Sequence, residues 1–342
     1  MSVKVSIAGA SGYTGVELLR ILSRYKEVEI IEISSRQYEG KALKEVFPFF
    51  IGSKFENLKF VNELNKNSSD FYFLCLPHEP SLKLAKELID NGKKVIDLSA
   101  AYRIKNASLY PKFYKFEHKY ITLLEKAVYG LPEIHREKIK SANLIANPGC
   151  YPTATLLALY PSLKNKIIKG NIIVNALSGI SGAGRSLKQQ FHYPEAFGNS
   201  YAYSPLNHRH IPEMEDQIKQ IIGKDIKVRF TPHILPVSRG MISTVSFETD
   251  LSNEELRAIY KELYNNEPFI RLIETPPQIK NVVGSNYCDI FVEKDERTNM
   301  AVIISAIDNL GKGASTQALQ NFNIMVGFEE TYVLKDLFSV YP

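Results

Sequence analysis

The chain has 342 residues, of which 44% are hydrophobic and 23% charged, a composition typical of a globular protein with about two domains. No apolar run approaches the roughly 18 residues of a membrane span, and an alternating strand at 3–7 stands where a signal peptide would begin, so we expect a cytoplasmic protein. The net charge of +5 is spread without a basic block, which argues against nucleic acid and suits a negatively charged small substrate.

Strands and helices alternate over the first 148 residues. This alternation predicts a Rossmann-like, doubly wound parallel sheet. The tract 102–129 is irregular and rich in Tyr, Lys and Phe, and is interpreted either as a cover over a site or as a surface excursion. The predicted strands are 3–8, 29–34, 71–76, 94–98 and 144–146, and the predicted helices are 16–22 and 81–91.

After residue 150 strand-like stretches outnumber helices, which predicts an α+β domain with a mixed or antiparallel sheet. A last helical run, 314–326, is expected to pack back on the first domain. We therefore expect a dinucleotide-binding domain of 1–148 and 312–342, and a catalytic and oligomerisation domain of 149–311. The predicted strands are 172–176, 227–230, 241–247, 288–292 and 300–306, and the predicted helices are 153–163, 212–222 and 253–265.

A glycine turn follows the first strand and opens the first helix. Its spacing, Gly-x-x-Gly-x-x-Gly, lets the backbone approach a pyrophosphate, which the N–H groups of the helix N-terminus then bind. A merely structural turn is the alternative, but the position directly after an N-terminal strand favours a dinucleotide. The predicted contacts are Gly9, Ser11, Gly12, Tyr13, Thr14 and Gly15, with Pro77 at the end of a later strand.

The end of the second strand indicates which dinucleotide binds. NAD sites place an acidic residue there for the ribose 2′-hydroxyl, whereas this chain has Ser34, Ser35 and Arg36, with Glu32 inside the strand. Two hydroxyls and a guanidinium suit a 2′-phosphate, so we expect NADP(H). The alternative is that Arg36 is only an exposed surface residue.

Cys150 carries the strongest local signal for chemistry. A strand ends at Ala146, a Pro-Gly turn follows, and Cys150 precedes the predicted helix 153–163. The free N–H groups and dipole at a helix start favour a thiolate and could hold an oxyanion. Cys75 and Cys288 lie within strands and are expected to be packing residues. Three scattered cysteines indicate neither a disulfide framework nor a metal site.

A base and anion-binding groups should accompany the nucleophile. His208 and His210 flank Arg209 at a helix start, and histidine is suited to proton transfer near neutral pH. The second glycine loop, 178–185, could bind phosphate or approach the nicotinamide through its backbone. The predicted contacts of that loop with cofactor are Ser178, Gly179 and Gly182. Arginines 103, 185 and 239 are candidate forks for carboxylate or phosphate.

Taken together, these motifs resemble the N-acetyl-γ-glutamyl-phosphate reductase family, the arginine-pathway branch of the semialdehyde dehydrogenase group. The resemblance runs nearly end to end and implies that Cys150 is the nucleophile, that His208 or His210 is the base, with His208 preferred, and that 308–314 closes over the nicotinamide. It rests on 9–15, 129–133, 147–153, 178–185, 208–213 and 308–314. The residues it adds are Asn309, Lys312 and Gly313 toward cofactor, and Asn147 and Glu213 beside Arg103, Arg185 and Arg239 toward substrate.

One departure concerns Ala101, where the family has an acid in Asp-Leu-Ser-Ala-Asp-Phe-Arg; a role for position 101 is therefore in doubt. The implied reaction is attack of the Cys150 thiolate on an acyl phosphate, followed by hydride transfer from NADPH to the thioester.

Two other functions stay open. One is a related reductase of a lysine pathway, whose acyl phosphate is linked to an acidic carrier protein. The other is a redox-sensing module that binds NADP without catalysis, against which the retained cysteine and histidines argue. The resemblance also implies a homodimer or homotetramer.

Overall fold

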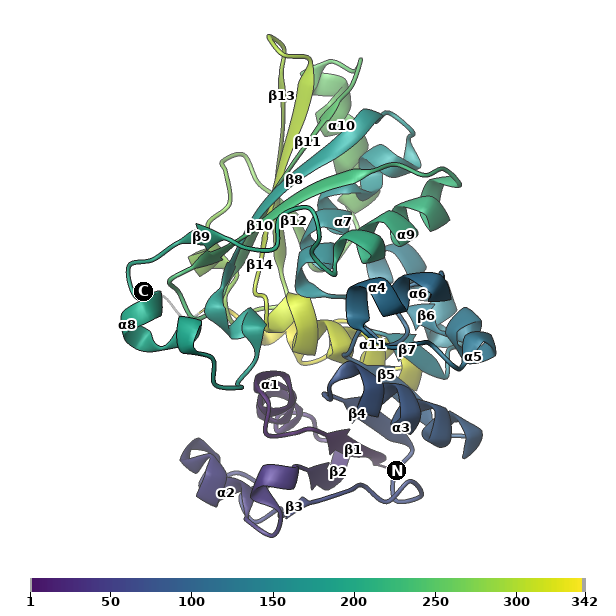
Figure 1. Ribbon diagram of the computed structural model, residues 1–342, viewed down its shortest axis with the longest axis vertical. Helices are drawn as coiled ribbons and strands as arrows, with labels where there is room; N and C mark the ends of the chain where they lie inside the picture. Colours follow the sequence, from purple (N-terminus) through teal and green to yellow (C-terminus); the bar gives the residue numbers. More distant parts are fainter. Residues whose placement is uncertain (1, 340–342) are drawn as a thin grey trace. The chain divides into compact units, whose positions relative to one another are not determined.

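The computed structural model describes residues 2–339 and forms two compact units (Figure 1). The first unit holds the described residues up to Lys105, residues 118–148 and residues 314–333. The second holds 106–117, 149–313 and the described residues from Leu334 on. Among the described residues, no helix is both long and apolar enough to cross a membrane.

The first unit is built on a seven-stranded sheet in the order β3-β2-β1-β4-β5-β7-β6, with every neighbouring pair parallel. The central strands are buried apolar runs, as expected for a sheet with helices on its faces. Its strands are β1 (Val3–Ala8), β2 (Val28–Ser34), β3 (Phe60–Val61), β4 (Phe71–Leu74), β5 (Lys94–Asp97), β6 (Val128–Tyr129) and β7 (Leu144–Ala146).

Helices connect and cover this sheet. The last of them, α11 (Thr316–Val326), inserts Phe322 against β4, with its ring centroid 5.2 Å from that of Phe71 and 5.6 Å from that of Phe73. A π-helical turn, Gly311–Ser315, precedes it. The C-terminal helix therefore rejoins the first unit, as expected. The other helices of this unit are α1 (Tyr13–Leu22), α2 (Leu43–Val46), α3 (His78–Asp90), α5 (Ile121–Lys126) and α6 (Pro132–Lys140).

The second unit has a mixed seven-stranded sheet in the order β12-β13-β14-β11-β8-β10-β9. Two neighbouring pairs, β8·β10 and β12·β13, are parallel, and the other four are antiparallel. Its strands are β8 (Lys169–Gly179), β9 (Tyr201–Ala202), β10 (Val228–Leu235), β11 (Met241–Glu248), β12 (Ile270–Leu272), β13 (Cys288–Asp295) and β14 (Met300–Ile307).

One long helix, α7 (Cys150–Lys164), forms the centre of this unit. Its residues from Tyr151 to Leu159 are all buried, which is typical of a helix surrounded by protein. The Ser305 hydroxyl donates to the carbonyl oxygen of Ala154 at 2.9 Å and ties the helix to β14. The remaining helices are α4 (Tyr110–Tyr114), α8 (Tyr193–Ala196), α9 (Ile211–Ile222) and α10 (Asn253–Tyr264).

The predicted fold class is confirmed: a parallel Rossmann-like sheet, a second mixed sheet, and a C-terminal helix that returns to the first unit. The units differ in detail from the expected division, because 106–117, 312–313 and 334–339 group with the second unit. Residues 1 and 340–342 of that division lie outside the described residues. The segment 106–117 forms an aromatic cluster, and its Tyr114 hydroxyl donates to the carbonyl oxygen of Arg209 at 2.9 Å.

Candidate active site

Cys150 is the first residue of α7, and Gly149 is its N-cap. The helix begins three residues earlier than predicted, because Pro152 lies in the first turn, where a missing N–H costs nothing. The peptide before Cys150 is fixed by Glu213 of α9: the Gly149 N–H donates to Glu213 Oε1 at 2.8 Å, and Glu213 is fully buried. The helix dipole and first-turn N–H groups favour a thiolate at this position.

His208 and His210 lie just before α9, and His210 is the N-cap of that helix. The backbone N–H of His210 donates to Nδ1 of His208 at 3.1 Å. A neutral imidazole whose Nδ1 accepts must carry its proton on Nε2. Burial, and then the charge of Arg209, lowers the pKa of His208 to about 3, so the ring stays neutral at physiological pH.

Aromatic rings surround the His208 imidazole. The ring centroids of Tyr151, Tyr203 and Phe230 lie 5.7, 5.4 and 5.4 Å from it, each nearly perpendicular to it. The His210 ring centroid is 4.8 Å away. The cage explains why the His208 ring is poorly hydrated and holds it in one orientation.

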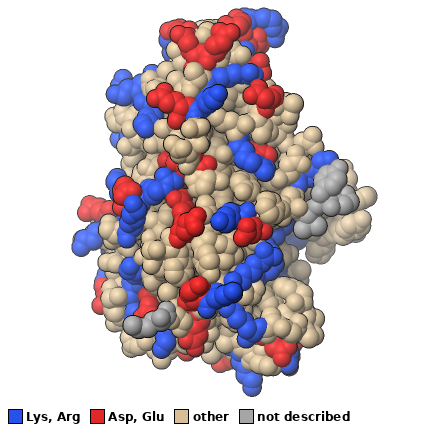
Figure 2. Space-filling view, turned by 180° about the vertical axis from the view of Figure 1, so that it is seen from behind, with Lys and Arg blue, Asp and Glu red and all other residues tan. Residues whose placement is uncertain are grey.

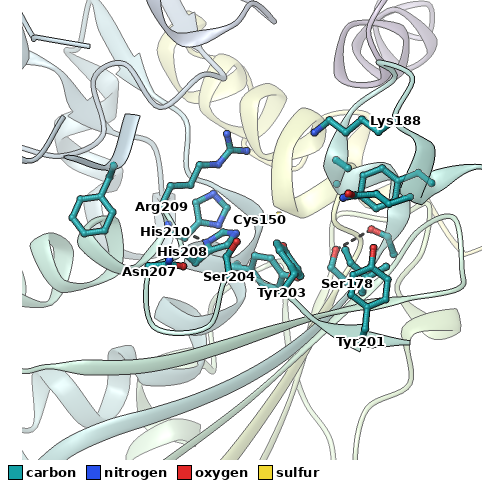
Figure 3. Close-up of a pocket in the computed structure, with 18 residues that line it drawn as sticks. Cys150, Ser178, Lys188, Tyr201, Tyr203, Ser204, Asn207, His208, Arg209 and His210 are labelled. Carbon is teal, nitrogen blue, oxygen red and sulfur yellow. Dashed lines mark hydrogen bonds between the residues drawn. The ribbon is translucent and has the colours of Figure 1, made fainter. Parts of the chain in front are cut away.

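A cavity of about 430 Å³ opens onto these groups, and all of its lining residues belong to the second unit. Figure 3 shows Cys150, His208 and His210 together on one side and Ser178 and Tyr201 on the other. No Asp or Glu is among the described residues that line it. The lining consists of Phe113, Cys150, Tyr151, Ser178, Gly179, Gly182, Ala183, Lys188, Gln190, Phe191, Tyr201, Tyr203, Ser204, Asn207, His208, Arg209, His210 and Ile234.

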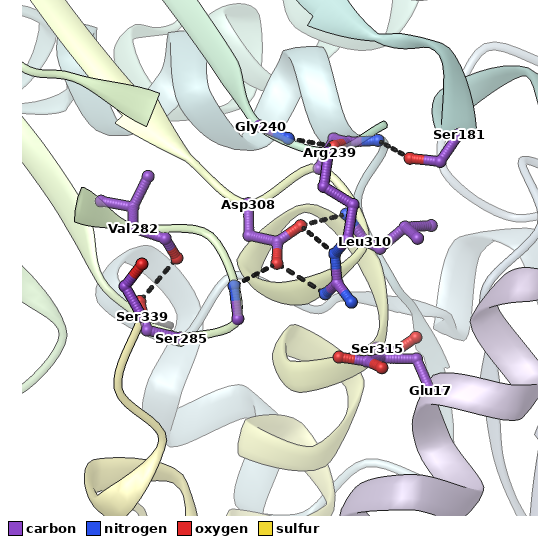
Figure 4. Close-up of polar contacts among 12 residues, drawn as sticks. Glu17, Ser181, Arg239, Gly240, Val282, Ser285, Asp308, Leu310, Ser315 and Ser339 are labelled. Carbon is purple, nitrogen blue, oxygen red and sulfur yellow. Dashed lines mark hydrogen bonds and ion pairs between the residues drawn. The ribbon is translucent and has the colours of Figure 1, made fainter. Parts of the chain in front are cut away.

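The segment from Asp308 to Gly313 is held in place by a buried carboxylate (Figure 4). Asp308 accepts two bonds from Arg239, Nε–Oδ1 at 3.2 Å and Nη2–Oδ2 at 2.5 Å, and one from the N–H of Gly284 at 2.7 Å. The Asn309 amide donates to Ser181 Oγ at 2.9 Å and accepts the Gly240 N–H at 2.7 Å. The segment is thus fixed to the second glycine loop.

Gly313 lies against Cys150. A Cβ on Gly313 would stand 2.7 Å from Cys150 Cβ, which is closer than real Cβ atoms approach. Lys312 is fully buried, with its ammonium 5.8 Å from the ring centroid of Phe269. The close approach of this backbone to Cys150 explains why the position requires glycine.

The first glycine turn has the geometry of a phosphate-binding turn. Gly9 has φ +72°, and a Cβ there would stand 2.4 Å from the carbonyl oxygen of Cys75. Gly15 packs equally tightly on Ala10, whereas Gly12, the N-cap of α1, would meet nothing closer than 3.5 Å. Two glycines are therefore needed for packing, while there is room for a larger group beside Gly12.

The end of β2 lies beside this turn. Ser35 and Ser11 share a hydroxyl–hydroxyl bond of 2.8 Å, and the Ser34 hydroxyl accepts the Gly9 N–H at 3.3 Å. Arg36 is exposed just beyond them. Glu32 points elsewhere, because its carboxylate accepts the Asn65 N–H at 2.8 Å. Among the remaining predicted contacts, Tyr13 and Pro77 are exposed and Thr14 is partly exposed.

Cys75 and Cys288 differ from Cys150. Burial raises the pKa of Cys75 to about 12, which keeps its thiol protonated. Cys288 is fully buried in β13. Among residues 2–339 no group of three or more His, Cys, Asp or Glu side chains is arranged to hold a metal ion.

Several residues predicted to bind substrate do not line the cavity. Arg103 is buried in the first unit, where its guanidinium donates to the carbonyl oxygens of Asn147 at 2.6 Å and Leu98 at 2.8 Å. Asn147, also in that unit, is fully buried and bonded to Asn321 at 3.1 Å. Glu213 accepts the backbone N–H of Gly149, and Arg239 donates to the carboxylate of Asp308. Arg185 is exposed on the second glycine loop.

The cavity also contains residues that the sequence did not single out. Phe113 comes from α4, and Lys188, Gln190 and Phe191 from the chain after the second glycine loop. Tyr203 donates from its hydroxyl to that of Tyr151 at 3.2 Å. In the sequence, these residues could have been found only from the irregular tract 102–129, which contains Phe113, and from the position of Lys188 beside a glycine loop.

Both halves of the chain match families of known proteins. Residues 4–142 match the family described as semialdehyde dehydrogenase, NAD binding domain, and residues 150–309 match semialdehyde dehydrogenase, dimerisation domain. Aspartate semialdehyde dehydrogenase II from Vibrio cholerae has the same fold, with a TM-score of 0.74 at 21% identity over 96% of this chain and 99% of that one.

Closer relatives share the full length. The N-acetyl-γ-glutamyl-phosphate reductase of Aquifex aeolicus is 51% identical over 100% of this chain and 99% of its own. That of Pelotomaculum thermopropionicum is 47% identical over 96% of this chain and 97% of its own. The chain belongs to the N-acetyl-γ-glutamyl-phosphate reductase family of the semialdehyde dehydrogenases.

Proposed function

We propose that this protein reduces N-acetyl-γ-glutamyl phosphate to N-acetylglutamate semialdehyde and inorganic phosphate, with NADPH as the reductant. The observation that carries the proposal is the position of Cys150 at the N-terminus of α7, in one cavity with His208 and His210. The names of the full-length relatives supply the substrate.

Cys150 begins the reaction as the nucleophile. Its thiolate attacks the acyl carbon, a carbon–sulfur bond forms, and the carbon–oxygen bond to phosphate breaks with its electron pair leaving on phosphate. The first-turn N–H groups of α7 stabilise the oxyanion of the tetrahedral intermediate. The product of this half-reaction is a thioester on Cys150.

The two histidines have different tasks. His208 is neutral with its proton on Nε2, so it donates a hydrogen bond to the carbonyl oxygen and does not take a proton. We therefore assign the base to His210 in place of His208, which the sequence favoured. His210 removes the thiol proton from Cys150 and returns it to the departing phosphate.

A nicotinamide cofactor would supply, when bound, the hydride that reduces the thioester to the oxyanion of a hemithioacetal. The turn Gly9–Gly15 would hold its pyrophosphate, and the residues after β2 its ribose. Cys150 then leaves as a thiolate, which the α7 N-terminus stabilises, and the aldehyde is released.

NADP is the cofactor that the end of β2 favours. The exposed Arg36 offers a guanidinium to a 2′-phosphate, whereas the hydroxyls of Ser34 and Ser35 are buried and hydrogen-bonded to the glycine turn. Glu32, the acid on this strand, is bonded to the Asn65 N–H and to the Ser68 hydroxyl and is not available to a ribose.

The protein is further proposed to work in the cytoplasm as a homodimer or homotetramer formed by the second unit. The match of 150–309 to a dimerisation domain supports the assembly. Light scattering after gel filtration would give the mass directly, and a monomer of 38.7 kDa would contradict it.

The reverse reaction tests the proposed function. Purified protein should form NADPH from N-acetylglutamate semialdehyde and NADP⁺ only when inorganic phosphate is present. Cys150→Ser should lose this activity, and Cys75→Ser should keep it. Turnover by Cys150→Ser at the rate of the unmodified protein, or no phosphate-dependent turnover by the unmodified protein, would refute the proposal.

A further inference from the structure

The catalytic cavity has an unusual charge. Two cations, Lys188 and Arg209, line it, and no carboxylate does among the described lining residues. On the face drawn in Figure 2, by contrast, basic and acidic side chains are interspersed. A cavity with cations alone attracts an anionic ligand and leaves the ligand's charge to be neutralised by these two residues.

The reaction described above assigns no role to Lys188. Among the residues that the structure describes, its ammonium has no acidic partner within ion-pair distance, and the centroid of the Phe191 ring lies 6.0 Å from it. Lys188 is exposed, and Figure 3 shows it at the edge of the cavity with its ammonium on the side toward Arg209. An ammonium in this position keeps its donors for a ligand.

The segment that carries Lys188 also carries polar groups of the cavity. It follows Ser178, Gly179, Gly182 and Ala183, all of which line the same cavity. Gly182 lies so close to Ser178 that a Cβ would be 3.3 Å from the hydroxyl oxygen. The Ser178 hydroxyl donates to the carbonyl oxygen of Gly179 at 3.1 Å, so the ammonium of Lys188 is the cavity-lining donor of this stretch that remains for phosphoryl oxygens.

We propose that Lys188 binds the phosphoryl group of the acyl phosphate, and the inorganic phosphate of the reverse reaction. The inference rests on the proposed function and identifies a residue that selects an acyl phosphate. A phosphoryl group carries close to two negative charges and has three terminal oxygens, whereas the substrate's carboxylate carries one charge. A compact ammonium on a flexible stem suits the former.

The test measures two Michaelis constants separately in the reverse reaction. Lys188→Gln should raise the KM of phosphate about tenfold, the loss expected for one charge-assisted hydrogen bond, and leave the KM of the semialdehyde unchanged. Lys188→Arg, which keeps the charge, should retain most of the phosphate affinity. Lys261→Gln, on the exposed side of α10, removes the same charge from the same unit and should match the unmodified protein.

A second readout does not require turnover. Phosphate should slow the alkylation of Cys150 by iodoacetamide in the unmodified protein, and about tenfold more phosphate should be needed for the same protection in Lys188→Gln. An unchanged phosphate KM in Lys188→Gln, or a raised KM for the semialdehyde alone, would overturn the assignment, the latter by placing the ammonium on the carboxylate. If the unmodified protein turns over no semialdehyde, the proposed function itself fails. The role of Lys188 is then refuted separately if phosphate protects Cys150 from alkylation equally well in the unmodified protein and in Lys188→Gln.

Discussion

The backbone N–H of His210 donates to Nδ1 of His208 over 3.1 Å, so two histidines of one short segment are chemically unequal. The bond occupies the nitrogen of His208 that could otherwise take a proton. It places the ring proton on Nε2 and leaves His210 to accept protons.

Glutamine at position 208 should therefore preserve function better than glutamine at 210. In His208→Gln the amide oxygen can replace Nδ1 and the amide N–H can replace Nε2–H, and we expect kcat/KM to fall by about tenfold or less. His210→Gln removes the base and should cost about 10² to 10⁴.

The pH profile separates the two roles. The acidic limb of kcat/KM should remain in His208→Gln and disappear in His210→Gln, because only a group that titrates produces such a limb. Loss of the limb in His208→Gln alone would identify His208 as the base and reverse the assignment.

The buried His208 should also make the protein sensitive to acid. Its pKa is about 3 in the folded state and 6.5 as the ordinary value, so between these the unfolded chain binds a proton that the folded protein does not. The free energy of unfolding should therefore fall as the pH falls below 6.5, by up to about 1.4 kcal/mol per pH unit from this residue. Urea titrations at several pH values give the free energy of unfolding, which should depend less steeply on pH in His208→Gln than in the unmodified protein. The same pH dependence in both proteins would contradict the prediction.

Gly313→Ala should inactivate the protein without unfolding it. The added Cβ would stand 2.7 Å from Cys150 Cβ and must displace the nucleophile, and misplacement by about 1 Å costs about 100-fold in rate. Gly223→Ala is a contrasting variant: Gly223 ends α9 with φ +72° and open space around it. It should lower the melting temperature and keep the activity. A fully active Gly313→Ala would show that the backbone near Cys150 can shift enough to accommodate the added Cβ without moving Cys150.

Glu213→Ala should lower stability and the reactivity of Cys150 together. It leaves the buried N–H of Gly149 without its acceptor, at a cost of about 1–3 kcal/mol. Glu213→Gln keeps an oxygen acceptor and should lose less. Urea unfolding measures the stability, and the rate of alkylation measures the reactivity of Cys150. If both are unchanged in Glu213→Ala, Glu213 does not position Cys150.

Arg36→Gln should weaken the binding of NADP⁺ without affecting the binding of NAD⁺. The loss of a charge-assisted bond to the 2′-phosphate is expected to raise the KM of NADP⁺ about tenfold. Arg24→Gln, an exposed arginine just after α1, is the matched control. Equal KM values for NADP⁺ in both variants would mean that Arg36 does not contact the phosphate.

Much of the fold was predictable because its elements are long and regular. The apolar run 71–76 and the alternation in 241–247 correspond to β4 and β11. The two-residue strands β3, β6 and β9 were not predicted, because two residues show no periodicity. Their pairing depends on the neighbouring strand and not on their own sequence.

The site divides in the same way. Cys150 and the histidine pair were identified from local signals, a turn and two helix starts. Phe113 and Lys188 come from irregular segments that only tertiary packing brings to the cavity. Arg103 and Arg239 were chosen for their charge, but the structure engages them with carbonyl oxygens and with Asp308. Residue type alone gives no sign of such a partner.

Glu213 joins two parts of the reaction machinery. It stands in the first turn of the helix capped by His210, and it holds the peptide that precedes Cys150. Through this one carboxylate, the peptide before Cys150 is connected to the helix that the histidines precede. On mild denaturation, thiol reactivity and proton transfer should vanish in a single cooperative step and not one after the other.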